Sequence, residues 1–407
     1  MSLKQYPKVL LMIIVIAAFF VRLIAIYPGH PPNHPDEPFV YDRAADMLTR
    51  LSIDPKKYYF YQVLPMYLHE AVYGSVFVPV TLLQNLILNP KVIVDNLPHF
   101  NTYISENIVK PNALYWGRLL VALLGALSII LIYLLAKEIY DVPTALIAAF
   151  LLAFNYRHFL SSVLSLNDIP NTFVTLITMF FLVRQLKKPT LKGLIIIGIM
   201  AGITFSVKFQ PFIFVPVGIA LLISVLQRKT KKTLDRLWIL VKESLLVFFV
   251  GALVIAVVNI LPLLHWRELN SFVNDVGVRN TVGKVGFRLY PYWFLYTIGI
   301  GSILSWLAIL GLAFSLTNKT MRKYTLVILF YFVWVFFFLS YYSSGGMFVR
   351  YFVPVIPLIL LFAAYVIRAI SVYLAKFIHV PVIFLAFALS IGFNQESIIN
   401  TVVASYN

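Results

Sequence analysis

Long apolar runs follow one another along almost the whole chain, and they constrain the fold more than any other feature. Most of them are close to the roughly 20 residues that an α-helix needs to cross the hydrocarbon core of a bilayer. Of the 407 residues, 61% are hydrophobic and 12% are charged, whereas a soluble domain has roughly 25% charged residues. The sequence therefore predicts an all-α, polytopic membrane protein. Eleven spans are expected, near residues 9–27, 114–135, 142–157, 168–186, 191–207, 211–227, 239–263, 293–316, 324–342, 352–370 and 378–394.

The basic residues predict how these spans are oriented, because Lys and Arg collect at the cytoplasmic ends of membrane helices. With a cytoplasmic amino terminus, the eleven spans leave only Arg157, Lys208 and Arg350 in the short outside turns. The inside ends then hold most of the other basic residues, including the cluster at 228–242. This distribution accounts for most of the net charge of +17 without a nucleic-acid partner. We expect a multi-pass protein of the cell membrane, plasma or inner, surrounded by membrane lipids.

One transmembrane domain over residues 1–407 is expected, with two sizeable external loops. The first loop covers 28–112 and the second, which is basic, covers 265–292. Within the first loop, 63–88 is apolar enough to span, but it contains a His-Glu pair and two prolines. Counting it as a span would also place the basic cluster at 228–242 on the outside. Charged residues inside a bilayer are costly, so we expect interfacial juxtamembrane helices there. No soluble carboxy-terminal domain is expected.

Several catalytic signatures are missing from the sequence. There is no cysteine, which excludes disulfides and thiolate metal sites. A phosphate-binding Gly-x-x-x-x-Gly-Lys loop, a Gly-x-Gly-x-x-Gly turn and a His-Glu-x-x-His motif are also missing, which argues against a membrane ATPase, a dinucleotide enzyme and a zinc protease. An activated substrate would therefore have to arrive in the membrane.

The acidic pair Asp36 and Glu37 lies between prolines directly after the first span. Asp36 could serve only as the N-cap of a helix that begins at Glu37, because Asp is a favoured capping residue. Its expected position outside the membrane also suits a general base that takes a proton from an attacking hydroxyl. Both interpretations stay open at this point.

Four charged residues are expected at the same depth as this pair: Arg118, Asp168, Lys208 and Arg350. Ionisable groups near membrane spans are costly and tend to mark function or ion pairs. Three cations would suit a phosphate-bearing lipid, whose oxygens accept charge-assisted hydrogen bonds. The alternative is a set of structural ion pairs, for example Arg118 with Asp168, or side chains that snorkel to the interface.

A metal site in the first loop is a further alternative. His30, His34, Asp36 and Glu37 are close in sequence, and His69 with Glu70 could join them. These residues have no established ligand spacing, and loop histidines are usually solvated. We therefore expect that no metal or other cofactor is required.

The order of these features resembles that of the GT-C glycosyltransferases, specifically the protein O-mannosyltransferase and aminoarabinose-transferase branch, glycosyltransferase family 39. The resemblance runs from about residue 8 to residue 370. It is carried by Asp36-Glu37-Pro38-Phe39-Val40-Tyr41, Arg118-Leu119-Leu120 with Gly125 and Tyr133, Arg157-His158 with Asp168-Ile169-Pro170, Gly198 and Gly202 followed by Lys208, and Arg350-Tyr351 with Pro354 and Pro357.

The resemblance implies a GT-C bundle and a sugar donor on a polyprenyl phosphate, with inverting transfer on the external face. By position, Asp36 would be the base and Glu37 would support it. The donor phosphate and sugar would be bound by Arg118, Asp168, Lys208, Arg350 and Tyr351. Many relatives carry a carboxy-terminal domain that helps to select the acceptor, and this sequence ends without one. The acceptor, whether lipid, glycan or protein, is left open.

Two functions without transfer chemistry compete with this interpretation. A lipid or glycolipid transporter or flippase would place paired charges and broken helices near the bilayer midplane, often in two related halves. Here the charges are expected at the outer edge, and no halves are detectable in the sequence. A membrane scaffold would need no ring of charges. A glycosyltransferase is therefore the leading hypothesis.

Overall fold

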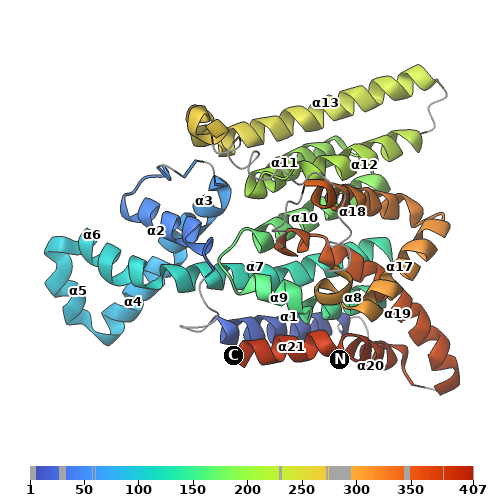
Figure 1. Cartoon of the computed structure of the whole chain (residues 1–407), viewed down its shortest axis with the longest axis horizontal. Helices are drawn as coiled ribbons and strands as arrows, with labels where there is room; N and C mark the ends of the chain where they lie inside the picture. The colour runs from blue at the N-terminus through green and yellow to red at the C-terminus, as the bar shows by residue number, and fades with distance from the viewer. Residues whose placement is uncertain are drawn as a thin grey trace.

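The computed structural model describes residues 6–26, 34–56, 58–59, 61–228, 232–271, 274, 295–342, 349–378 and 380–406. Within these ranges the regular elements are all helical (Figure 1). In chain order the principal helices are α1 (Tyr6–Ala25), α2 (Tyr41–Thr49), α3 (Val63–Val72), α4 (Val78–Leu88), α5 (Pro90–Asn96), α6 (Phe100–Tyr103), α7 (Lys110–Ile139), α8 (Val142–Ala153), α9 (Tyr156–Ser162), α10 (Asp168–Lys187), α11 (Leu191–Lys208), α12 (Phe214–Leu226), α13 (Thr233–Val258), α14 (Ile260–Leu264), α17 (Ser302–Thr317), α18 (Arg322–Tyr342), α19 (Ile356–Ile378), α20 (Val382–Phe393) and α21 (Gln395–Tyr406).

The predicted all-α membrane bundle is confirmed, although its helices differ from the predicted spans in detail. A helix is found at each of the eleven predicted positions. Eight helices of the described chain are long and apolar enough to cross a membrane, or nine if the bent pair α20 and α21 counts as one span. The apolar helices α8, α12 and α17 are shorter than that. The run at 142–157 is not one helix, because α8 ends at Ala153 and α9 begins at Tyr156.

The first predicted loop is largely helical and forms an arm that projects from one end of the bundle (at the left of Figure 1). A helix with a π-helical turn, η2 (Tyr73–Phe77), covers Val63–Leu88. The chain then turns and continues as a 50-residue helix from Pro90 to Ile139, which packs beside the first helix and includes α7. Val63–Leu88 is one of the eight helices that could span a membrane by length and composition, and its interfacial position stays a prediction.

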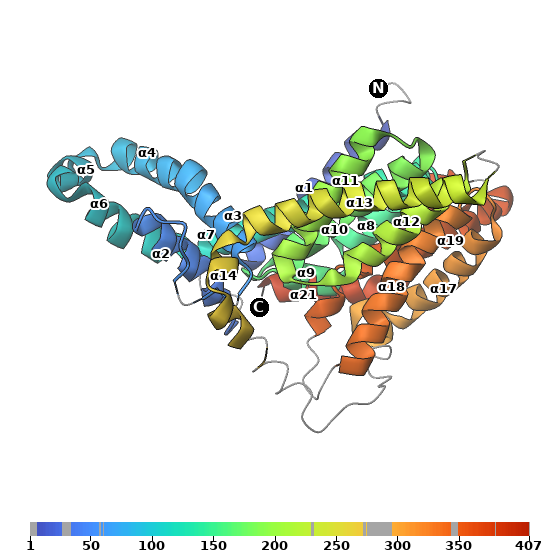
Figure 2. The same cartoon turned by 90° about the horizontal axis from the view of Figure 1, so that it is seen from above.

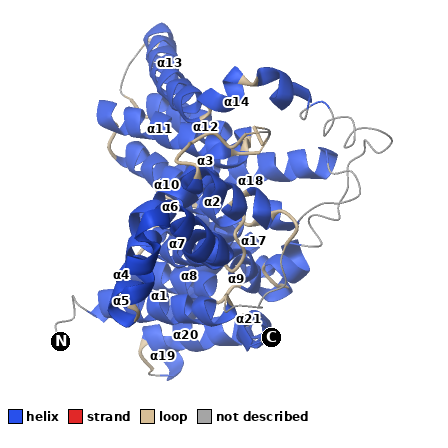
Figure 3. Ribbon diagram, turned by 90° about the vertical axis from the view of Figure 1, so that its left-hand side faces the viewer, coloured by secondary structure: helices blue, strands red, loops and turns tan. Residues whose placement is uncertain are grey.

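The end of the bundle that carries the arm faces the viewer in Figure 3. The second predicted loop, 265–292, lies mostly outside the described residues. At its start the His265 ring stacks on Tyr59 of the first loop, with centroids 3.8 Å apart and planes 5° from parallel. The two predicted loops therefore meet at this end of the bundle.

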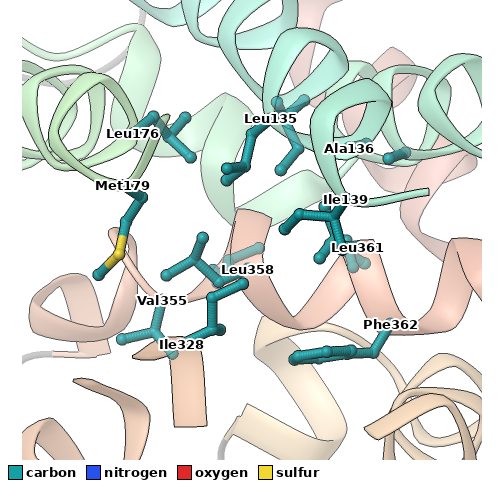
Figure 4. Packing of buried hydrophobic residues seen from close by; sticks show 14 of the residues in the cluster. Leu135, Ala136, Ile139, Leu176, Met179, Ile328, Val355, Leu358, Leu361 and Phe362 are labelled. Carbon is teal, nitrogen blue, oxygen red and sulfur yellow. The ribbon is translucent and has the colours of Figure 1, made fainter. Parts of the chain in front are cut away.

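The hydrophobic core lies where α7, α8, α10, α18 and α19 meet (Figure 4). Leu135 and Ile139 of α7, Met179 of α10, Ile328 of α18 and Leu361 of α19 point into one cluster. Helices α7 and α8 are apolar around most of their circumference, as expected of helices enclosed by others. Helix α13 instead runs along the edge of the bundle, with most of its surface uncovered (Figure 2).

Glycines allow two helix pairs to approach closely. A Cβ atom on Gly202 of α11 would lie 2.7 Å from the Gly251 carbonyl oxygen of α13. A Cβ atom on Gly311 of α17 would lie 2.1 Å from the Phe362 carbonyl oxygen of α19. Neither neighbour is a flexible side-chain end, so the helices would have to separate. Small residues at such crossings are typical of membrane helix packing.

We predict that Gly311→Ala destabilises the protein, because the added methyl group meets backbone and overpacking costs about 1–3 kcal/mol. The measurement is thermal unfolding in detergent. Gly218→Ala in α12 is the matched control, since a Cβ atom there has nothing within 4 Å, and it should leave the midpoint unchanged or raise it. Equal midpoints for Gly311→Ala and the wild type would contradict the predicted clash.

Candidate active site

A fully buried ion pair joins the first loop to the bundle. Glu37 begins the short 3₁₀ helix η1 (Glu37–Phe39) and is 0% exposed, and Arg118 of α7 is 3% exposed. Arg118 donates from Nε to Oε1 at 2.9 Å and from Nη2 to Oε2 at 2.8 Å. The backbone N–H groups of His34 and Ser165 donate to the same carboxylate, at 2.9 and 2.8 Å. Glu37 therefore fixes the loop to α7 and to the segment before α10.

This pairing leaves Asp36, the neighbour of Glu37, at the edge of the buried region. Asp36 occupies the N-cap position of η1, but its carboxylate makes no capping hydrogen bond. Arg350 of η7 (Val349–Phe352) donates from Nη2 to Asp36 Oδ2 instead. The backbone N–H of Asp36 donates to His34 Nδ1 at 3.1 Å. Asp36 keeps 31% of its side chain exposed, so a substrate could reach the carboxylate.

Helices α10 and α11 supply a second pair beside the first. Asp168 is the first residue of α10 and accepts a hydrogen bond from Lys208, the last residue of α11. Phe209 then takes a left-handed conformation, with φ of 48°, which ends α11 directly after the lysine. The Lys208 ammonium lies 4.3 Å from the Tyr351 ring centroid, and the Arg350 guanidinium lies 5.9 Å from it. Tyr351 thus connects the two pairs.

The structure brings the predicted site residues together, but in pairs that the sequence did not specify. The suggested ion pair of Arg118 with Asp168 is wrong. Arg118 is paired with Glu37, and Asp168 is paired with Lys208. Asp36, Arg350, Tyr351, Lys208 and Asp168 form a continuous row, which we call the charged row. The pair of Glu37 and Arg118 lies next to it along the chain. The catalytic and binding roles assigned to these residues stay predictions.

Two further residues, Arg157 and Tyr61, lie near the charged row, and sequence reasoning did not include them in the site. The charges of Asp168 and Arg350 act on the Arg157 guanidinium of α9. Burial, and then the negative charges of Asp36 and Asp168, raise the pKa of Tyr61, so its phenol stays protonated at neutral pH. Tyr61 belongs to an aromatic run, and that composition by itself indicated only a position at headgroup depth. Its ring stacks on Phe39 of η1, with centroids 5.4 Å apart.

The charged row combines cations with acids, and Arg157 lies near it. The cations are Arg157, Lys208 and Arg350, and the acids are Asp36 and Asp168. Glu37 and Arg118 neutralise each other. Burial lowers the pKa of Arg350, but Asp168 and the hydrogen bond to Asp36 outweigh that effect and raise it. A phosphate group would find at this place several cationic donors.

An apolar cavity of about 420 Å³ lies between η6 (Leu295–Gly299), α17, α18 and α19. Its lining includes Leu312, Phe332 and Phe336. The Phe336 ring packs against Phe352 of η7, with centroids 4.9 Å apart, and Phe352 follows Arg350 by two residues. The cavity is therefore suited to a hydrocarbon chain, and the contact between Phe336 and Phe352 connects its lining to η7.

A buried arginine anchors α9, which carries Arg157. Arg22 of α1 is 0% exposed and donates from Nη1 to the Ala18 carbonyl oxygen at 2.8 Å. Its Nη2 lies 3.1 Å from Nδ1 of His158, which is also buried. Because arginine only donates, the imidazole accepts at Nδ1. Helix α9 is thereby held against α1 and α8.

The residues considered for a metal site do not converge. His30 lies outside the described residues. His69 is buried, with Nδ1 2.7 Å from the Pro65 carbonyl oxygen and Nε2 3.3 Å from Ser165 Oγ. No group of three or more His, Asp or Glu side chains in the described ranges is placed to hold a metal ion.

Residues 112–266 match the family model described as dolichyl-phosphate-mannose-protein mannosyltransferase. A comparison with curated protein sequences finds no match. The match covers the stretch of the chain from α7 to α14, which supplies Arg118, Arg157, Asp168 and Lys208 to the site.

Solved structures share the fold at low sequence identity. The oligosaccharyltransferase of Archaeoglobus fulgidus in the apo form matches with a TM-score of 0.66 and 15% identity, over 99% of this chain and 56% of that one. AglB of the same organism, in complex with an inhibitory peptide and a dolichol-phosphate, matches with a TM-score of 0.60 and 15% identity, over 99% and 56%. ArnT from Cupriavidus metallidurans, bound to undecaprenyl phosphate, matches with a TM-score of 0.59 and 16% identity, over 100% and 76%. This chain spans a little over half the length of the Archaeoglobus protein.

These findings confirm the resemblance to the GT-C superfamily. The bundle is similar to that of ArnT and AglB over almost the whole chain. The family model adds a match in sequence over 112–266. The predicted GT-C-like fold class is therefore correct.

We predict that Glu37→Gln lowers stability, because it leaves the buried Arg118 charge without its counter-charge. Breaking a buried ion pair by removing one partner costs about 3–5 kcal/mol, and thermal unfolding in detergent would measure the loss. Asp36→Asn is the matched control, since that side chain is 31% exposed and its loss should cost far less. If the two variants unfold at the same temperature, Glu37 is not the anchor of the first loop.

Proposed function

We propose that this chain, which has the fold of the GT-C glycosyltransferases, transfers a sugar from a polyprenyl-phosphate donor to an acceptor hydroxyl. The observation that carries the proposal is the charged row, in which the partly exposed carboxylate of Asp36 is paired with Arg350 and lies beside Lys208 and Arg157. ArnT with undecaprenyl phosphate and AglB with a dolichol-phosphate, both similar in fold, support a lipid phosphate as the ligand.

The donor phosphate would bind to Arg350 and Lys208, with Arg157 nearby. Arg350 and Lys208 are paired with Asp36 and Asp168, so phosphate oxygens would compete with these carboxylates for the same N–H groups. The polyprenyl chain would lie in the apolar cavity next to Phe336. Arg118 is bound in two places to Glu37, so we assign it to positioning the loop instead of binding the phosphate.

The transfer itself would be a single displacement at the anomeric carbon. The acceptor oxygen attacks that carbon, the bond from the carbon to the phosphate oxygen breaks, and Asp36 takes the hydroxyl proton. Arg350 and Lys208 stabilise the negative charge that develops on the departing phosphate. Inversion follows from attack on the side opposite the phosphate. Phosphate capture by Arg350 would also release Asp36 from its ion pair just when a base is needed.

This scheme assigns no step to a metal ion. The charge on the leaving phosphate is met by Lys208 and Arg350, with Arg157 close by. We therefore propose that transfer does not depend on a divalent metal.

The same helices support an orientation for the reaction. The charged row lies at the arm end of the bundle, while Lys137 of α7, Arg184 and Lys187 of α10, and Lys192 of α11 lie at the opposite helix ends. Basic helix ends are typically cytoplasmic. We propose that transfer takes place on the external face of the cell membrane, with the amino terminus in the cytoplasm.

We predict that Asp36→Asn lowers the transfer rate by about 10²-fold or more, the range expected for a general base. Transfer would be measured with a polyprenyl-phosphate sugar and an acceptor fraction from the source cells, and donor binding would be measured in parallel and should persist. The control is Asp42→Asn on α2, whose carboxylate is 51% exposed and pairs with its neighbour Arg43. Full activity of Asp36→Asn would exclude Asp36 as the base.

Removing Lys208 should weaken binding of a polyprenyl phosphate, because a hydrogen bond to a charged group contributes about 1.5–3 kcal/mol, or roughly 10- to 100-fold in affinity. Equilibrium binding of undecaprenyl phosphate to Lys208→Ala would test this. Lys187→Ala is the control, since Lys187 is exposed at the opposite helix end and pairs with Glu138. Unchanged affinity in Lys208→Ala would mean that Lys208 serves only to hold Asp168.

A further inference from the structure

A second cavity, of about 570 Å³, lies at the bend between α20 and α21, where the two helix axes differ by 69°. The first residue of α9 and the start of α17 complete its wall. We call it the α20–α21 pocket, and the residues that matter most to its chemistry are Tyr156, Phe393, Asn394, Gln395, Glu396 and Asn400. Its volume falls in the range of small-molecule sites, roughly 300–1,000 Å³.

The lining of the α20–α21 pocket combines polar and apolar groups, and its described residues include no positive side chain. Asn394, Gln395 and Asn400 provide amides, Glu396 provides a carboxylate, and Tyr156 and Phe393 provide rings. Among the described residues that line it, none is Lys, Arg or His. Such a surface disfavours phosphate. Amides and a carboxylate together accept from and donate to hydroxyl groups, and an aromatic ring can cover an apolar sugar face.

Asn394, which lines the pocket, has a side-chain oxygen without a hydrogen-bond donor among the described residues. Asn394 is 2% exposed, and its Nδ2 donates to the Phe154 carbonyl oxygen at 3.4 Å. Its Oδ1 is buried and accepts no hydrogen bond from the described part of the chain. A buried acceptor of this kind costs about 1–3 kcal/mol, and such groups are rare in native structures. Oδ1 is itself closed off from the open space of the pocket, so the groups that can bond to a ligand are the exposed amides of Gln395 and Asn400 and the exposed carboxylate of Glu396.

The pocket is also held in shape by its own hydrogen bonds. Ser397 of α21 accepts from the Tyr156 backbone N–H at 2.6 Å and donates to the Phe154 carbonyl oxygen at 3.0 Å. Asn155 caps α9 at its side chain oxygen and donates from Nδ2 to the Gly299 carbonyl oxygen at 2.9 Å. These bonds join α9, α21 and η6. The cavity is therefore preformed, and little ordering would accompany binding.

The α20–α21 pocket adjoins the charged row through α9. Tyr156 lines the pocket, and the next residue, Arg157, lies within the electrostatic influence of Asp168 and Arg350. The pocket and the charged row therefore approach α9 at neighbouring residues.

We propose that the α20–α21 pocket binds an uncharged, hydroxyl-rich sugar unit, and that this unit belongs to the acceptor. The assignment to the acceptor rests on the transferase function proposed above, whereas sugar binding itself does not. The pocket's lack of cations separates it from the donor phosphate, which is matched by the charged row. The acceptor of this enzyme is accordingly a carbohydrate or a molecule that carries one.

The test is equilibrium binding of neutral trisaccharides, namely maltotriose, cellotriose and mannotriose, to purified protein in a detergent without a sugar head group. We expect at least one of them to bind the wild type with a Kd in the millimolar range or below. Gly392→Leu should weaken that binding at least tenfold, because Gly392 lines the pocket and a Cβ atom there has nothing within 4 Å. Gly218→Leu on α12 is the matched control, with equally open surroundings, and it should bind as the wild type does.

A second variant protects the test against misfolding of the first. Glu396→Gln keeps the size of an exposed side chain and should weaken binding of the same trisaccharide, because a charged acceptor becomes a neutral one. The proposal is overturned if no neutral trisaccharide binds the wild type, if binding survives both variants, or if a phosphorylated sugar binds the pocket more tightly than the neutral one.

Binding of undecaprenyl phosphate, measured on the same preparations, separates this inference from the proposed function. It should be equal in the wild type, Gly392→Leu and Glu396→Gln, because the charged row is intact in all three. Trisaccharide binding without any binding of undecaprenyl phosphate would disprove the donor assignment and leave the sugar pocket standing. The reverse result would disprove the sugar pocket alone.

Discussion

The buried pair of Glu37 and Arg118 is the interaction on which the rest of the site depends. Both side chains are almost fully removed from solvent, and burying two charges carries a desolvation cost of several kcal/mol per ion unless their hydrogen bonds are well met. Here the carboxylate accepts two bonds from Arg118 and two from backbone N–H groups. The loop after the first helix is therefore held in one position, and Asp36, one residue earlier, is held with it.

With Asp36 fixed in this way, the cations of the charged row are held in ion pairs that a phosphate could replace. Asp36 and Asp168 neutralise Arg350 and Lys208, and a phosphate would compete for both cations. Substrate binding would then convert two ion pairs into a phosphate clamp and two released carboxylates. Buried α9 supports this arrangement from the other side, since Arg22 and His158 hold it against the first helix. The charged row and its surroundings are thus built from groups on the first loop, α9, α10, α11 and η7.

The sequence predicted the helical membrane bundle and the depth at which its charges lie. Hydropathy and the placement of Lys and Arg are local properties, so they can be read residue by residue. They placed Arg118, Asp168, Lys208 and Arg350 at one level, and the structure finds them at one end of the bundle. The same local reasoning failed at 142–157. The predicted span ran through Phe154 and Asn155, whereas in the structure α8 ends at Ala153 and Asn155 caps a new helix, α9.

Which side chains meet was decided only by tertiary structure. Depth along a helix does not specify the angle at which a residue faces its neighbours, and that angle follows from close packing of α7, α10, α11 and α19 around the core. For this reason the sequence could not distinguish Asp168 from Glu37 as the partner of Arg118, and it could not place Tyr61 or Arg157 in the site. The bend at Asn394 brings α21 back against α9, and the polar pocket there is a product of the folded chain alone. The sequence predicted that carboxylates and cations would lie at one depth, and packing decided that Glu37 would be a buried anchor while Asp36 stayed partly exposed.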